Sequence, residues 1–448
     1  MGRMVRVSMG LVICLLVSFT IIPSLILPID EQHSETPLFR TKLVRAQELL
    51  SPWNWTYGTA NFDRGSSVVE VSTGGFALAG AIGGGGPDLN DVWLLLTDEN
   101  GNAQSSHTYG GPLDDIGWDI LEVEAGGFLI SGQTDSFGAG DFDAWLLRVD
   151  ASGNHLWNHT YGGTYDEWGW SVIEVSTGGF AISGRTASLG AGSDDVWLIR
   201  TDADGNHLWN QTYGGFDSDI GRELIEVSGG GFAIIGATQS YGAGSSDVWL
   251  IRTDANGNEL WSRTFGGSMT DTALGLIEVS TGGFAITGRT QSFGAGATDL
   301  WLIRTNTNGD HVWNQTFGGL SLDEGSSLVE VSTGGFAITG FTGSTGAGVE
   351  DLWLIFTDTT GNHLVNYTFG GTAYDTGTAI IDVSTGGFLI AGTTESFGAG
   401  VTDAWLIRIT EQPTTPPPPP IPGFPLEAIA LGTLIALSIR LIFRRRRR

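Results

Sequence analysis

A 52-residue period governs most of this chain. Seven tryptophans recur at that spacing, each two residues after an aspartate, and the phenylalanine of a Gly-Gly-Phe motif recurs in step with them. The tryptophans are Trp93, Trp145, Trp197, Trp249, Trp301, Trp353 and Trp405. Self-similarity at a fixed period of this length is typical of a repeat architecture, in which each copy is one supersecondary unit. We therefore expect one repetitive body over residues 51–410.

Each repeat contains four segments that favour β-strands, separated by glycine-rich and asparagine-rich turns. In the third repeat they are residues 171–175, 180–185, 195–201 and 207–213. Four antiparallel strands in each of seven repeats predict an all-β fold, a seven-bladed β-propeller of 52-residue, four-stranded blades. The last repeat stops at Ile409 without a fourth strand, whereas residues 53–58 match the missing pattern. We expect this N-terminal strand to complete the last blade and remove a free sheet edge.

Three motifs carry a resemblance to known proteins: Gly-Gly-Phe, Asp-x-Trp-Leu-Ile-Arg and Gly-Asn-x-Leu-Trp. Through them residues 51–410 resemble the WD40, kelch and quinoprotein-like propeller superfamily, and are most similar to propeller repeats of secreted microbial surface proteins. The His and Trp-Asp signature of WD40 blades is absent, so intracellular scaffolding does not follow from the resemblance.

The composition excludes some functions. A formal net charge of −28 argues against nucleic-acid binding, which needs clustered Lys and Arg. The single cysteine, Cys14, lies outside the repeats, so disulfides cannot stabilise them and a thiol-based metal or redox site is excluded there.

The two ends of the chain predict export and membrane attachment. Residues 1–29 read as a signal peptide or signal anchor, followed by a linker over residues 30–50. Residues 411–425 form a proline-rich linker, residues 426–443 an apolar helix long enough to just span a bilayer, and residues 444–448 a cytoplasmic arginine tail. Pro422-Gly423-Phe424, the helix and the arginines together resemble the C-terminal sorting signals of archaeal surface proteins. We expect a cell-membrane protein with the propeller on the extracellular side.

Acidic residues recur at three positions of the repeat. One position precedes each tryptophan, and a second starts the first strand of each repeat; both are expected on one face of the disc. Carboxylates there are candidate Ca²⁺ ligands, or alternatively acceptors for backbone N–H groups of neighbouring turns. The candidate metal ligands are Asp63, Asp115, Asp219, Asp323 and Asp375. The third position, that of Glu70, is expected near the propeller axis, where converging carboxylates would splay, protonate or bind a cation.

Asparagine-linked glycosylation motifs recur in one phase of the repeat. They begin at Asn54, Asn158, Asn210, Asn314 and Asn366. Export would make these asparagines modification sites on outer strands, although threonine is also favoured in strands for its own sake.

Departures from the repeat point to a ligand site. Trp118, Trp168 and Trp170, with Tyr165 nearby, occur only in the second and third repeats, and aromatic faces on a polar rim suit stacking on sugar rings. Packing between blades is the alternative explanation. No symmetry-breaking catalytic set stands out, and we expect no organic cofactor.

The sequence therefore predicts a monomeric binding or cell-surface interaction module, attached to the membrane by a terminal helix, for a carbohydrate or protein ligand. The alternative is a polysaccharide hydrolase or lyase, or a quinoprotein-like enzyme, with its site on the propeller rim.

Overall fold

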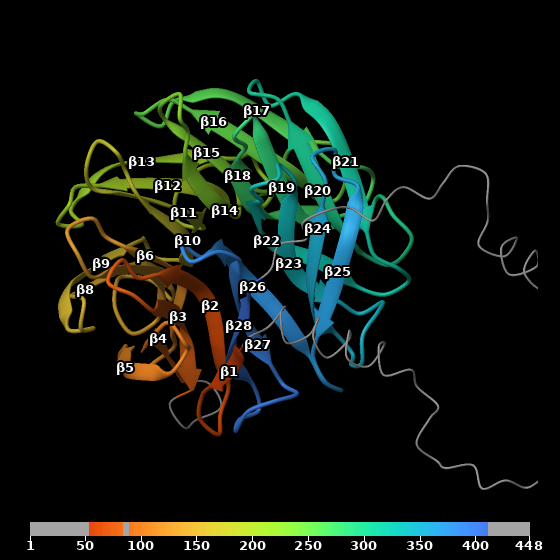
Figure 1. Cartoon of the computed structure of the whole chain (residues 1–448). Helices are drawn as coiled ribbons and strands as arrows, with labels where there is room; N and C mark the ends of the chain where they lie inside the picture. Colours follow the sequence, from red (N-terminus) through yellow and green to blue (C-terminus); the bar gives the residue numbers. More distant parts are fainter. Residues whose placement is uncertain (1–52, 84–88, 411–448) are drawn as a thin grey trace, which may run out of the picture. The chain divides into compact units, whose positions relative to one another are not determined.

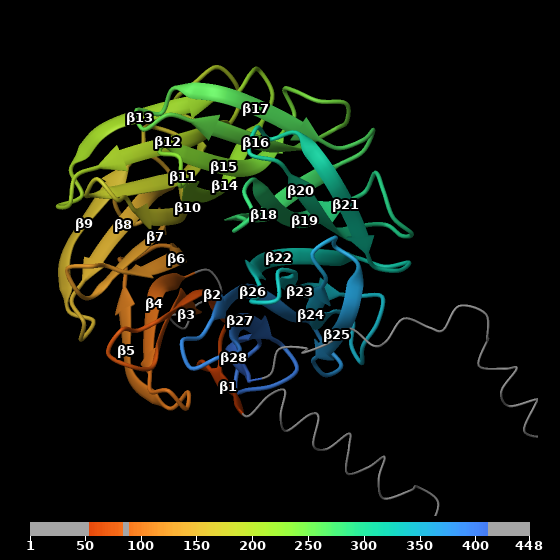
Figure 2. The same ribbon diagram turned by 45° about the horizontal axis from the view of Figure 1, so that its top comes forward.

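The computed structural model describes residues 53–83 and 89–410, which form 28 β-strands in seven four-stranded antiparallel sheets. The sheets stand as blades in a ring around a central axis (Figures 1 and 2). The predicted all-β, seven-bladed propeller is thereby confirmed. The predicted segments 1–29, 30–50, 411–425, 426–443 and 444–448 lie outside the described residues.

Every blade contains four strands in order from the axis outward. The inner strands are β2 (Asp63–Glu70), β6 (Asp115–Glu122), β10 (Glu167–Glu174), β14 (Asp219–Glu226), β18 (Asp271–Glu278), β22 (Asp323–Glu330) and β26 (Asp375–Asp382). The second strands are β3 (Phe76–Gly83), β7 (Phe128–Thr134), β11 (Phe180–Thr186), β15 (Phe232–Thr238), β19 (Phe284–Thr290), β23 (Phe336–Thr342) and β27 (Phe388–Thr394). The third strands are β4 (Asn90–Thr97), β8 (Asp143–Val149), β12 (Asp195–Thr201), β16 (Asp247–Thr253), β20 (Asp299–Thr305), β24 (Asp351–Thr357) and β28 (Asp403–Ile409). The outer strands are β1 (Trp53–Tyr57), β5 (Ala103–Tyr109), β9 (His155–Tyr161), β13 (His207–Tyr213), β17 (Glu259–Phe265), β21 (His311–Phe317) and β25 (His363–Phe369).

The hydrophobic core lies between the blades. Second and third strands are buried on both faces, as in β12, where all seven residues are buried. Seven apolar clusters fill the seven interfaces; one of them packs Leu129 and Leu146 of one blade against Phe180 and Trp197 of the next. Because sheets buried on both faces need apolar residues throughout, the second and third strands read as nearly continuous hydrophobic runs.

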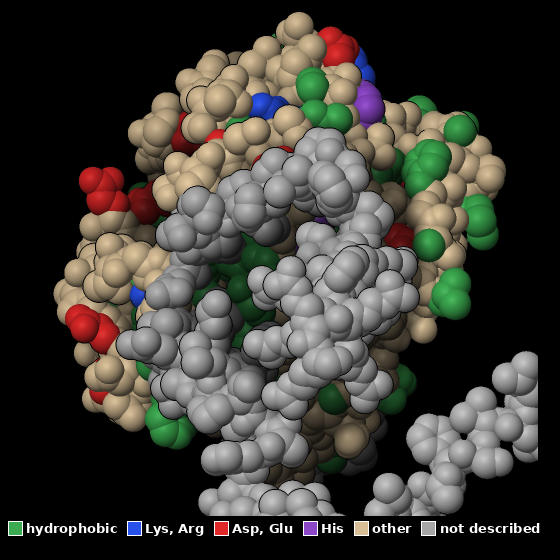
Figure 3. Space-filling model, turned by 45° about the vertical axis from the view of Figure 1, so that its right-hand side comes forward, with side chains coloured by type: hydrophobic (Ala, Val, Ile, Leu, Met, Phe, Trp, Pro, Cys, Tyr) green, Lys and Arg blue, Asp and Glu red, His purple; other side chains and the backbone are tan. Residues whose placement is uncertain are grey.

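The outer edge of the disc is mostly polar. Along this edge, hydrophobic side chains stand singly among other residue types (Figure 3). Leu156, Leu208 and Leu260 occupy one phase of the outer strands and are each more than half exposed. Scattered apolar side chains of this kind are normal on a protein surface and do not mark an interface.

Each inner strand carries one β-bulge, at which its pairing with the second strand shifts by a residue. In β10 the shift falls between Gly169 and Ser171 and leaves Trp170 without a partner in the ladder. The second strand must offer a glycine there, because a Cβ at Gly184 would lie 1.7 Å from the carbonyl oxygen of Trp168. A glycine inside a strand often accompanies such a bulge.

The ring is closed by its own N-terminal strand, as predicted. β1 pairs antiparallel with β28, from Trp53 opposite Arg408 to Tyr57 opposite Ala404. β1 is thus the fourth strand of the last blade, and β28 presents no free edge over this stretch. A paired edge cannot recruit a strand from another chain.

We expect deletion of residues 1–58 to lower the melting temperature by about 5 °C or more, because β28 would lose its outer partner and Trp405 its cover. Thermal unfolding followed by circular dichroism measures the change. Deletion of residues 1–50, which retains β1, is the control. Equal midpoints for both deletions and the full chain would contradict closure by β1.

Candidate functional site

A cavity of about 1060 Å³ runs through the centre of the ring and is lined by residues of all seven inner strands. We call it the central channel. The residue displaced by each bulge faces it, so that every blade contributes one side chain that takes no part in strand pairing. These residues are Ser66, Trp118, Trp170, Arg222, Leu274, Ser326 and Thr378. A bulge re-aims a side chain in this way, and here it leaves the position free to differ in every repeat.

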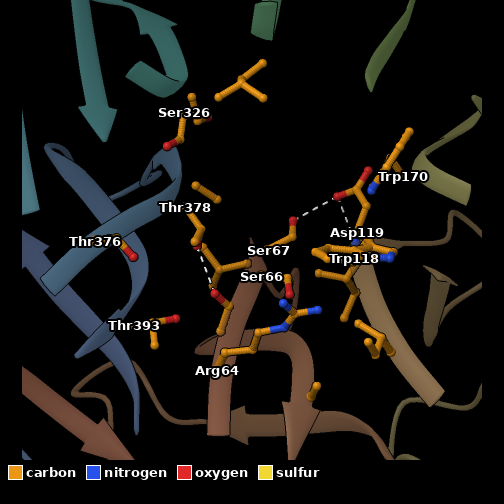
Figure 4. A pocket seen from close by; sticks show the side chains of 18 of the residues that line it. Arg64, Ser66, Ser67, Trp118, Asp119, Trp170, Ser326, Thr376, Thr378 and Thr393 are labelled. Carbon is orange, nitrogen blue, oxygen red and sulfur yellow. Dashed lines mark hydrogen bonds between the residues drawn. The ribbon is translucent and has the colours of Figure 1, made fainter. Parts of the chain in front are cut away.

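The channel wall has two chemically different sides. Most of the hydroxyl groups come from blades one, six and seven, whereas Trp118, Asp119 and Trp170 face them from blades two and three (Figure 4). Ser171 of blade three also lines the cavity. The hydroxyl side contains Ser66, Ser67, Ser326, Ser327, Thr376, Thr378 and Thr393. The sevenfold symmetry of the packing residues therefore ends at the channel wall.

Arginine side chains stack on the three tryptophans that break the repeat. Arg64 lies 4.2 Å from the ring centre of Trp118, and Figure 4 shows the two side by side. Arg222 lies 3.9 Å from the ring centre of Trp170. A guanidinium over an aromatic face is a favourable cation–π contact, worth about 0.5–2 kcal/mol.

The third tryptophan, Trp168, packs against Trp170 but is not part of the channel lining. Its ring stands edge-to-face to Trp170 at 5.1 Å, and Arg185 covers it at 4.0 Å. Arg185 also pairs with Asp194 at 2.8 Å. Of the predicted aromatic patch, Trp118 and Trp170 therefore line the channel, and a guanidinium already occupies one face of each of the three indole rings.

Tyr165 lies apart from this group. It is 63% exposed in the loop before β10, where its backbone N–H donates to Ser188 Oγ, and it does not line the channel. Its proximity to Trp168 in the sequence does not place its ring with the three tryptophans, because the loop turns outward before the strand begins.

Repeated arginines and tryptophans serve the fold. Arg148, which belongs to a phase present in five repeats, donates to the carbonyl oxygen of Phe128 at 3.1 Å and to that of Val149. Trp145 donates its indole N–H to Asn158. By contrast, the indole nitrogens of Trp168 and Trp170 are buried without a partner. Buried polar groups are normally satisfied. The exceptions are not confined to the channel, since the indole nitrogen of the repeated Trp353 is also buried without a partner.

Two carboxyl groups in the channel wall join neighbouring blades. Asp119 accepts hydrogen bonds from Ser67 Oγ at 2.8 Å and from the backbone N–H of Val172 at 3.0 Å, and burial raises its pKa. Glu223 accepts from the N–H of Leu276 at 2.5 Å, and burial raises its pKa to about 8. Glu223 is therefore mostly protonated at neutral pH.

The predicted metal ligands accept protein hydrogen bonds. Asp63, with 0% exposure, accepts from the N–H of Gly83 at 2.9 Å and from Thr59 Oγ1. The equivalent residues Asp115, Asp219, Asp323 and Asp375 each accept from a backbone N–H four residues earlier. The aspartate two residues before the tryptophan also accepts backbone hydrogen bonds, as Asp143 does from the N–H of Ala139. A Cβ on Gly110 would contact both Asp91 and Asp115, so the two acidic rings lie on one face of the disc, as expected. Among residues 53–83 and 89–410, no group of three or more His, Cys, Asp or Glu is placed to hold a metal ion.

The third acidic position was expected near the axis, but its carboxylates bind the adjacent blade. Glu226 accepts from the backbone N–H of Ser176 at 2.8 Å and from its Oγ at 2.7 Å. The same pair of bonds joins Glu70 to Ser384 across the closing interface. These carboxylates thus join neighbouring blades, and a cation near the axis stays a prediction.

The five glycosylation motifs lie on outer strands. Asn158, Asn210 and Asn314 accept the indole N–H of the tryptophan on the neighbouring strand at 3.1 Å, and their side-chain nitrogens contact a histidine ring nitrogen at 2.8–2.9 Å. Asn54 accepts more weakly from Trp405 at 3.4 Å, and Asn366 contacts His363 at 2.8 Å. The recurrence of asparagine in this phase thus has a structural reason, while attachment of sugar stays a prediction.

No family model matches the sequence. The regulatory protein FlaEY of Caulobacter vibrioides is 27% identical over 186 residues, which cover 35% of this chain and 19% of that protein. The match thus spans about a fifth of the length of this curated relative.

Two solved structures are similar in arrangement. The WD40 domain of Neurospora crassa Pan2 matches with a TM-score of 0.46 and 10% identity, over 78% of this chain and 92% of that chain. The extracellular domain of a putative hybrid two-component system from B. thetaiotaomicron matches with a TM-score of 0.47 and 16% identity, over 82% of this chain and 44% of that chain. Likeness at this level does not extend to function.

In the part of the chain that the structure describes, no helix has the length and apolar character to cross a membrane. The predicted membrane helix, residues 426–443, lies outside that part.

We expect a chelator to leave the melting temperature unchanged, because the carboxylates of the Asp63 phase already accept protein hydrogen bonds. Differential scanning calorimetry with EDTA, and with added Ca²⁺ as the control, tests this. A midpoint that falls with EDTA and recovers with Ca²⁺ would instead support the calcium site expected from the sequence.

We expect the stability of the protein to fall between about pH 5 and pH 8 through Glu223. Its pKa in the folded protein, about 8, exceeds the ordinary value of 4.5, so the folded state alone holds this proton in that window. The stabilisation is fully present below the unfolded pKa and is lost as pH rises through the folded one. Urea unfolding of Glu223→Gln across this range should give a shallower decline than wild type, with exposed Glu259→Gln as the control. Parallel curves for wild type and Glu223→Gln would show that Glu223 titrates normally.

Proposed function

We propose that the protein is an extracellular, membrane-anchored binding module, and that the central channel is its ligand site. The observation that carries the proposal is the loss of symmetry at the channel wall. Packing residues repeat from blade to blade, whereas the seven bulge residues comprise two tryptophans, an arginine, a leucine and three hydroxyl-bearing side chains. A wall that served only packing would have no need of such variety.

A carbohydrate is the ligand class that suits this wall best. Ligand sites are concave, with apolar and aromatic surface and a few convergent polar groups, and commonly measure about 300–1,000 Å³. The channel, at about 1060 Å³, is of this size and combines tryptophan with many hydroxyl groups. Hydroxyls both donate and accept hydrogen bonds, as sugar hydroxyls do.

Export and membrane attachment belong to the same proposal and are supported by the predicted segments 1–29 and 426–443. The enzymatic alternative has less support, because the carboxyl groups of Asp119 and Glu223 are engaged with Ser67, Val172 and Leu276.

A substitution that fills the channel tests the proposal. Ser326 occupies the bulge register at which two other blades carry Trp118 and Trp170, so the backbone accommodates tryptophan at this position. We expect Ser326→Trp to weaken binding to oligosaccharides on a glycan array at least about tenfold, by occupying the space that a ligand needs.

Leu260→Trp, at a 59% exposed position of outer strand β17, is the matched control and should bind as wild type does. Melting temperatures of both variants verify folding. Equal binding by Ser326→Trp and wild type would rule out the channel as the site, and turnover of a bound polysaccharide would favour the enzymatic alternative.

A further inference from the structure

Two arginines of the channel wall lack an anionic partner in the described part of the chain. Neither the guanidinium of Arg64 nor that of Arg222 makes an ion pair or donates a hydrogen bond there, although the Nε of each is buried. The nearby Arg185 and Arg289 differ, because they pair with Asp194 at 2.8 Å and with Glu324 at 2.9 Å. Arg64 and Arg222 therefore have no anionic partner in direct contact among the described residues, although the carboxylate of Glu324 offsets part of the fall in the pKa of Arg222.

Burial of the unpaired guanidinium groups of Arg64 and Arg222 destabilises the folded protein unless a further partner accepts their hydrogen bonds. Burying a charge without a partner is unfavourable, and burial lowers the pKa of both Arg64 and Arg222 to about 10, so that they stay charged at neutral pH. Their contacts with Trp118 and Trp170 recover part of the cost through cation–π attraction. The N–H groups themselves remain unused.

The geometry leaves Arg222 free to form a two-pronged contact. Trp170 covers one face of its guanidinium and its Nε is sealed off, whereas its two terminal nitrogens have no protein partner and are not sealed off. The terminal nitrogens of arginine match the two oxygens of a carboxylate in a parallel pair of hydrogen bonds. The carboxyl groups of Asp119 and Glu223 do not supply that anion, because each accepts hydrogen bonds from a neighbouring blade. Glu324 acts on Arg222 from a distance but forms its ion pair with Arg289, at 2.9 Å.

The rest of the wall indicates what the anion is attached to. Ser326, Thr376 and Thr393 bring hydroxyl groups to the channel opposite the tryptophans, and Ser66 lies beside Trp118 (Figure 4). A small inorganic anion would use the arginines and leave these hydroxyls and most of the cavity unoccupied. A sugar ring that carries both hydroxyl groups and a carboxylate uses both sides of the wall.

We propose that the channel binds acidic saccharides, with the carboxylate of a uronic acid unit held by Arg222 and attracted by Arg64. The inference rests on the proposed function and specifies its ligand class. The lining also contains the carboxyl groups of Asp63, Asp119, Glu223, Glu324 and Glu395. Selection of the acidic sugar over neutral ones of the same shape therefore depends on its direct contact with Arg222 and not on a positive field in the channel.

Isothermal titration calorimetry of the full chain, with trigalacturonate and with neutral galactotriose as probes, tests the proposal. We expect trigalacturonate to bind at least about tenfold more tightly, since a charge-assisted pair contributes that much. Arg222→Gln should weaken trigalacturonate binding by about tenfold or more and leave galactotriose binding unchanged, and added NaCl should weaken only the acidic probe. Arg222→Lys, which keeps the charge but not the fork, should restore part of the affinity.

Arg263→Gln on outer strand β17 is the matched control, because it removes one exposed positive charge outside the channel wall. Equal affinity of both probes, with no effect of Arg222→Gln, would overturn the acidic-sugar inference and leave the proposed function standing. Inorganic phosphate that binds as tightly as trigalacturonate and displaces it would show an anion site without sugar recognition. If neither saccharide binds, the acidic-sugar inference is overturned, and the result counts against the proposed function as well.

Discussion

The structure depends on one displaced residue in each inner strand. Around the axis, seven strands approach one another, and the bulge lets each strand bend while its neighbours in the blade keep their pairing. The second strand accommodates the bend with a glycine, since any side chain at Gly184 would collide with the backbone of β10. Core residues such as Val68 and Ile120 also line the channel, but the displaced residue alone takes no part in strand pairing.

The difference between paired residues and the displaced bulge residue explains how one chain can be highly repetitive and still form a specific ligand site. Blade-to-blade contacts use the same pairs everywhere, such as Glu226 with Ser176 and Glu70 with Ser384, so the ring can be assembled from copies. Recognition of one ligand, however, needs a site without rotational symmetry. The bulge register supplies it, because substitution there changes the channel and leaves the ladder intact.

Much of the fold could be predicted from the sequence because the period, the turn glycines and the missing strand of the last repeat are all local patterns. The bulge could not be located, since a displaced residue occupies the same place in the sequence as a paired one. Trp118 and Trp170 were noticed only because tryptophan is conspicuous, whereas Arg222 and Ser326 at the same register were not. A residue that varies inside an otherwise constant repeat, beside a glycine, is the signal that could have found them.

The chemical role of the acidic residues also could not be decided from the sequence. The recurrent aspartates suit either metal binding or acceptance of backbone N–H groups, and in the folded chain Asp63 and Asp219 accept such N–H groups. Sequence gives the residue type and its period; only the folded chain gives the donors around it. The arginines illustrate the same point from the donor side. Arg148 has carbonyl acceptors nearby, whereas the guanidinium of Arg222 does not.

The pairing of β1 with β28 also has a consequence for biogenesis. These strands are separated by nearly the whole ring, so the first blade and its neighbours can form during synthesis while the N-terminal strand still waits for a partner made last. Contacts between such distant segments form slowly, and an unpaired strand can meanwhile join the last blade of another copy. A high concentration of nascent chains would therefore favour strand-exchanged dimers, and dilution would favour self-contained rings.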